Sequence, residues 1–71
     1  MGNSLSLLKR IASGEVSVDR ISISQQIMVA LAFDDESIFP FDWASRSEQE
    51  KLARLDSEQI AAIKAYKQAQ L

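Results

Sequence analysis

Hydrophobic residues are unevenly distributed along the chain, and the longest unbroken run covers seven positions, from Ile27 to Phe33. A helix over this run has no polar face, so it has to be covered on every side. Ser22 and Gln25, just before the run, have the spacing of a capping box, which favours a helix that ends near Phe33. The pattern therefore predicts a central helix that is enclosed by the rest of the chain, by a second copy or by a partner.

The start of this central helix is ambiguous. Between residues 14 and 24, hydrophobic and polar side chains alternate in two short stretches, as in a strand, with a break at Asp19 and Arg20. Ser17 could begin a helix early, whereas the capping box at Ser22 begins it later. We predict a helix whose first residue is undefined to within several positions.

A helix is also predicted near the beginning of the chain. Asn3 or Ser4 could cap it, and Gly14 could end it, because glycine readily adopts the left-handed conformation that follows many helices. Its hydrophobic side would carry residues at helical spacing, namely Leu5, Leu8 and Ile11 or Ala12.

The last third of the chain holds the clearest helical signals. Asp56 and Gln59 form a capping box ahead of a helix expected from about Ser57 to Gln70, and Leu55 with Ile60 has the spacing of a hydrophobic staple. Ile60, Ile63 and Tyr66 share one face of that helix.

A shorter helix precedes it. Ser47 and Glu50 form another capping pair, ahead of a helix through Leu52 and Leu55. The two helices would form an αα-hairpin with its corner at Asp56. One uninterrupted helix over residues 47–70 is the alternative.

Together these elements predict an all-α fold, a small bundle of three or four short helices with a C-terminal αα-hairpin, in a single domain over residues 1–71. The 71 residues include no cysteine and no histidine, so disulfides and zinc sites of thiolates and imidazoles are excluded. A chain of this length can bury only a small hydrophobic core, so its stability is marginal, and small proteins commonly gain stability by association. This favours a chain that binds a partner or itself.

The segment from residue 33 to residue 43 combines aromatic and acidic side chains. It contains every Phe and Trp of the chain, together with four acids: Phe33, Phe39, Phe41, Trp43, Asp34, Asp35, Glu36 and Asp42. Pro40 favours an extended backbone at Phe39, and in an extended segment the rings at 39, 41 and 43 project to one side. The rings could close the core or anchor an interface, and different rings could serve each purpose.

The expected contact surface consists of hydrophobic residues from these two regions: Met28, Leu31, Phe33, Phe39, Phe41 and Trp43. Through it we expect the chain to bind another protein, or itself as a homodimer, without enzymatic activity. A small regulator, inhibitor or assembly adaptor fits this expectation.

Other kinds of site have less support. The acids at 34, 35 and 36 are consecutive, so their side chains diverge, and the ligand pattern of a calcium loop is absent; we expect no metal, no cofactor and no small-molecule substrate. Without histidine or cysteine, a serine lacks the usual base, so no catalytic residue is assigned. The longest hydrophobic run is far shorter than the ~20 residues of a membrane span, and no signal peptide is visible, so a cytoplasmic location is expected.

Two alternatives remain open. The predicted hairpin could act as a DNA-binding helix-turn-helix, although Glu58 puts an acid where base contacts begin, and the net charge of −2 does not favour nucleic acid. The first six residues, with Gly2 and Ser6 in place, fit the pattern for N-myristoylation, which would make the chain a membrane-associated peptide.

Overall fold

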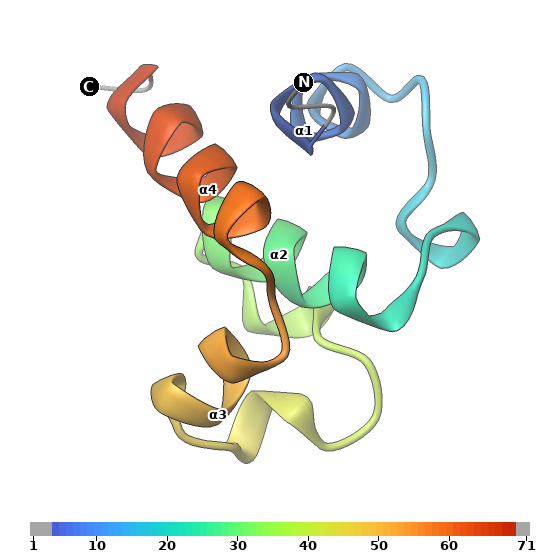
Figure 1. Cartoon of the computed structure of the whole chain (residues 1–71). Coiled ribbons are helices and arrows are strands. Elements are labelled where there is room, and N and C mark those ends of the chain that lie inside the picture. The colour runs from blue at the N-terminus through green and yellow to red at the C-terminus, as the bar shows by residue number, and fades with distance from the viewer. Residues whose placement is uncertain (1–3, 70–71) are drawn as a thin grey trace.

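A computed structural model describes residues 4–69, which form four α-helices and no strand (Figure 1). The helices are α1 (Ser4–Ala12), α2 (Ile23–Phe33), α3 (Glu48–Ala53) and α4 (Ser57–Ala69). Three short 3-10 turns lie between them, at Val18–Arg20, Glu36–Ile38 and Trp43–Ser45. The prediction of a small all-α fold is confirmed. A cap at Asn3 and a lipid at Gly2 lie outside the described residues.

Gly14 ends α1 as its sequence position indicates. Its φ is +85°, a conformation in which a side chain is strained. The amide of Gly14 donates to the carbonyl of Ile11 (3.1 Å), and the amide of Glu15 donates to the carbonyl of Arg10 (2.9 Å). This pair of bonds is a Schellman motif, which satisfies carbonyls that the helix leaves free.

The capping box at Ser22 defines the start of α2. The Ser22 hydroxyl accepts from the amide of Gln25 (3.2 Å), and the Gln25 side chain accepts from the amide of Ser22 (3.0 Å). The alternating residues before it form no strand; they hold only the 3-10 turn. At the other end, Asp34 adopts the left-handed conformation with φ +53°.

α3 and α4 are separate helices, so the single uninterrupted helix is wrong. Ser47 caps α3 by accepting from the amide of Glu50 (3.2 Å). The capping box at Asp56 is complete, with the amide of Gln59 donating to the Asp56 carboxylate (2.8 Å) and the Gln59 side chain accepting in return (3.1 Å). The antiparallel hairpin is not confirmed, because α4 packs chiefly on α2 and α1, and α3 lies beyond its amino-terminal end (Figure 1).

The core surrounds α2. Four large side chains have no exposed surface, and three of them belong to this helix: Leu8, Ile27, Met28 and Val29. Ala30 and Ala32 are also buried, so five of the seven residues from Ile27 to Phe33 are enclosed by the chain itself. Leu31 and Phe33 remain half-buried. The chain therefore supplies most of the cover that this hydrophobic run requires.

Candidate functional site

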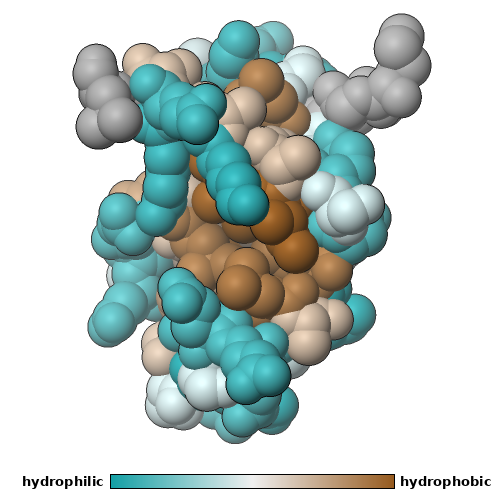
Figure 2. Space-filling model, turned by 60° about the vertical axis from the view of Figure 1, so that its left-hand side comes forward, coloured by the Kyte–Doolittle hydropathy of each residue, from teal (hydrophilic) through white to brown (hydrophobic). Residues whose placement is uncertain are grey.

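A hydrophobic groove lies between α2, α3 and α4, on the side of α2 that carries the half-buried Leu31. Its volume is about 220 Å³, and it is lined by residues from all three helices: Leu31, Glu48, Leu52, Ile60, Ile63, Lys64 and Lys67. Figure 2 shows hydrophobic side chains gathered at the centre of a face of the molecule, with hydrophilic residues around them. We call the hollow lined by these seven residues the α2–α3–α4 groove.

The groove stays open because α3 does not close over it. This helix has only six residues and buries none of them. Its Leu52 is 36% exposed, although it lines the groove. Lys51 holds α3 toward the preceding loop, since its ammonium group donates to the carbonyl of Ala44 (3.3 Å) and lies 4.4 Å from the centre of the Phe39 ring. A leucine is therefore presented to solvent beside half-buried hydrophobic neighbours.

The two walls of the groove carry opposite charges. The α3 wall contributes Glu48, and the α4 wall contributes Lys64 and Lys67. Lys67 also pairs with Asp34, at 3.3 Å between the ammonium nitrogen and a carboxylate oxygen. Glu48 and Lys64 are exposed and form no ion pair among residues 4–69. These two charges are available to a molecule that enters the groove.

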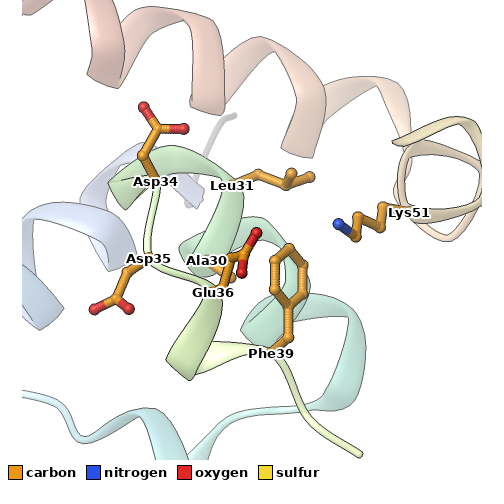
Figure 3. Close-up of a pocket in the computed structure, with 7 residues that line it drawn as sticks. All are labelled: Ala30, Leu31, Asp34, Asp35, Glu36, Phe39 and Lys51. Carbon is orange, nitrogen blue, oxygen red and sulfur yellow. The ribbon is translucent and has the colours of Figure 1, made fainter. Parts of the chain in front are cut away.

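A second hollow, of about 180 Å³, adjoins the groove on the other side of Leu31 (Figure 3). Figure 3 shows Phe39 and Lys51 on one side of it, while the carboxylates of Asp34 and Asp35 point away. Within residues 4–69, no three His, Cys, Asp or Glu side chains are grouped so that they could hold a metal ion.

The aromatic segment is folded, and its three rings do not share one side, because the backbone is extended at Phe39 (φ −59°, ψ 133°) but left-handed at Phe41 (φ +53°). Two 3-10 turns interrupt it, at Glu36–Ile38 and Trp43–Ser45. Phe39 and Trp43 turn inward and pack against the core, and Arg46 covers the Trp43 ring at 4.4 Å. Phe41 points outward and is 85% exposed.

The backbone at Phe41 is also unusual. Its φ is +53°, a conformation that costs an ordinary residue about 1–2 kcal/mol. The turn that contains it is closed by a hydrogen bond of 3.1 Å from the amide of Trp43 to the carbonyl of Pro40. The fold therefore holds one aromatic side chain in water at a strained position.

The predicted contact residues are divided among several environments. Leu31 lines both hollows and Phe39 lines the second. Met28 is fully buried, so it is not accessible to a partner in this conformation. Phe33 is half-buried and its ring lies 5.2 Å from that of Tyr66.

Sequence reasoning did not assign a binding role to the other residues that line the groove. In the sequence, Leu52 and Ile60 have the pattern of ordinary helix and staple positions. Helical spacing does place Ile60, Ile63, Lys64 and Lys67 on neighbouring positions of one face. The position of α3 beside that face depends on tertiary contacts.

Within the described part of the chain, no helix combines the length and the hydrophobicity needed to cross a membrane. Comparisons with protein-family models, with curated proteins and with solved structures found no match to the chain.

Proposed function

We propose that the chain is a non-enzymatic protein-binding module, a small regulator, inhibitor or assembly adaptor, that acts through the α2–α3–α4 groove. The observation that carries the proposal is the partly exposed hydrophobic lining of this groove, with charged residues at its rim. Protein interfaces commonly have this organisation, with a hydrophobic centre that loses water on binding and a polar edge. Leu31 lines the groove and Phe39 lines the adjoining hollow, whereas Met28 is fully buried.

Part of the hydrophobic surface that lines the groove is still in contact with water in the folded chain, so burying it can stabilise a complex. Leu52 is exposed, and Leu31 and Ile60 are half-buried, so a partner that covers them removes further hydrophobic surface from water. Each square ångström of that surface contributes roughly 25 cal/mol. A few partly exposed aliphatic side chains therefore support a modest affinity, to which the charged rim adds specificity.

Phe41 provides a second point of contact in this proposal. An exposed ring at a strained backbone position is a feature that folding stability alone does not favour, and such positions are concentrated at functional sites. Aromatic side chains are also enriched among the residues that dominate interface energies.

The helix-turn-helix alternative is less favoured by the packing of α4. The first turn of α4, which would contact bases, carries Glu58. Its carboxylate accepts from the hydroxyl (2.5 Å) and the amide (3.3 Å) of Ser4 at the start of α1. The end of the helix that would enter a groove of DNA is therefore engaged with another part of the chain.

The proposal is tested with two matched substitutions, Leu52→Gln in the groove and Ile23→Gln outside it. Both side chains are 36% exposed, so the two variants change similar amounts of surface. Immobilised wild-type chain and the Ile23 variant are expected to retain the same binding protein, or a second copy, while Leu52→Gln loses it with an unchanged circular dichroism spectrum. Equal retention by both variants, or no retention by the wild type, would refute the proposal.

A further inference from the structure

We propose that the α2–α3–α4 groove binds the same groove of a second copy of this chain, in a homodimer with two-fold symmetry. This inference rests on the proposed function and specifies its partner. In a two-fold dimer the same patch is used on both subunits, so a surface can form one only if it is complementary to itself.

The distribution of charge satisfies this condition. Glu48 lies on the α3 wall and Lys64 on the α4 wall of the same groove. A two-fold axis that lies in the interface and runs along the groove exchanges the walls, so it places the α3 wall of each copy against the α4 wall of the other. Glu48 of one copy then faces Lys64 of the other, and the pair occurs twice. A groove with the same charge on both walls would repel its own copy.

The shape of the α3 wall fits the same arrangement. Glu48 and Leu52 are four residues apart on one helix, so they share a face. Leu52 projects from that face with 36% of its surface exposed, next to the hollow of about 220 Å³. In the two-fold arrangement, Leu52 of each copy enters the groove of the other while Glu48 reaches the lysine on its rim.

The charges involved have no competing partners in the described chain. Lys67 is paired with Asp34, but neither Glu48 nor Lys64 forms an ion pair within residues 4–69. Pairing between copies therefore breaks no existing ion pair of either residue. A single solvent-exposed ion pair contributes little to the free energy of association. In this dimer the hydrophobic centre therefore supplies most of the affinity, and the ion pairs determine how the two copies are aligned.

The size of the chain is compatible with such an interface. Its accessible surface is 4719 Å², and a stable interface of ordinary size covers about 800 Å² on each partner, roughly a sixth of that surface. With only four large side chains fully buried in the described part, the fold has a small core. Chains of this size commonly gain stability through association.

The experiment uses charge reversal and measures molar mass by sedimentation equilibrium over a range of concentrations. Wild type is expected to dimerise, whereas Glu48→Lys and Lys64→Glu each place like charges across the interface twice and raise the dissociation constant at least tenfold. The control Lys9→Glu makes the same change of charge as Lys64→Glu, but on an exposed residue of α1 outside the groove, and is expected to dimerise as wild type does.

The decisive sample is an equimolar mixture of Glu48→Lys and Lys64→Glu. Each reversed side chain then faces the opposite charge on the other variant, so the mixture is expected to form a heterodimer that neither variant forms alone. A wild type that stays monomeric at every concentration, or a mixture that stays monomeric, would overturn the inference.

Failure of the dimer remains distinguishable from failure of the proposed function. A monomeric wild type that captures another protein, and loses it on Leu52→Gln, overturns the dimer and supports the binding module. A dimer that is unaffected by both charge reversals and by Leu52→Gln overturns the inference, because its interface lies elsewhere.

Discussion

Truncation of Met28 and of Leu52 to alanine should separate the residues that maintain the fold from those that bind. Met28 has no exposed surface and lies in the centre of the core, between Ile27 and Val29 in the sequence. Shortening a buried methionine to alanine costs about 2–5 kcal/mol, because hydrophobic contacts are lost and a cavity remains. Leu52 is 36% exposed, so its truncation loses only part of what a fully buried leucine contributes and should lower the free energy of unfolding by about 1 kcal/mol.

The expected cost at Met28 is large relative to the free energy of unfolding of the fold. At roughly 0.05–0.15 kcal/mol per residue, a chain of this length has a free energy of unfolding of about 4–11 kcal/mol. Met28→Ala is therefore expected to remove a large part of it, and Leu52→Ala a much smaller part. Urea unfolding followed by circular dichroism measures both values, and the capture assay measures binding. A folded Met28→Ala variant of wild-type stability that has lost binding would refute the division between core and groove.

Three further substitutions test local features. Phe41→Gly relieves the positive φ, so the free energy of unfolding should be unchanged or rise by up to about 1 kcal/mol; a clear loss in urea unfolding would mean that the ring packs on the fold. Gly14→Ala, at φ +85°, should lower it by about 1–2 kcal/mol through strain alone, because open space surrounds the added methyl group; an unchanged midpoint would contradict the cap at the end of α1. The Ser17 hydroxyl donates to Asp19 and lowers the pKa of that carboxyl, so Ser17→Ala should raise the pKa toward its ordinary value in an NMR titration. Because the folded pKa is the lower one, this hydrogen bond stabilises the fold above the unfolded pKa, and the contribution is lost as the pH falls through the folded pKa.

Features that depend on neighbouring residues were predictable from the sequence. The boxes at Ser22 and Asp56 and the stop at Gly14 are satisfied by bonds that span a few residues, so the spacing of the side chains is sufficient to identify them. The hydrophobic run after Ser22 also identified the buried helix, because a helix without a polar face has to be enclosed.

Features that depend on tertiary packing were not predictable in the same way. The spacing of Phe39, Phe41 and Trp43 indicates a common side only if the backbone is extended, and packing of two rings against the core favours turns instead. The groove depends on where α3 lies relative to α4, and capping signals define the ends of a helix without specifying its neighbours. Leu52 therefore has no signal in the sequence that distinguishes it from a core residue.

The most direct test of the groove as a contact surface is methyl NMR of the wild-type chain as its concentration is raised. The account predicts that the methyl signals of Leu31, Leu52 and Ile60 shift together as copies associate. The signal of Ile23, which is equally exposed as Leu52 but lies outside the groove, should stay constant. Groove signals that remain constant at every concentration, or shifts centred on Ile23, would contradict it.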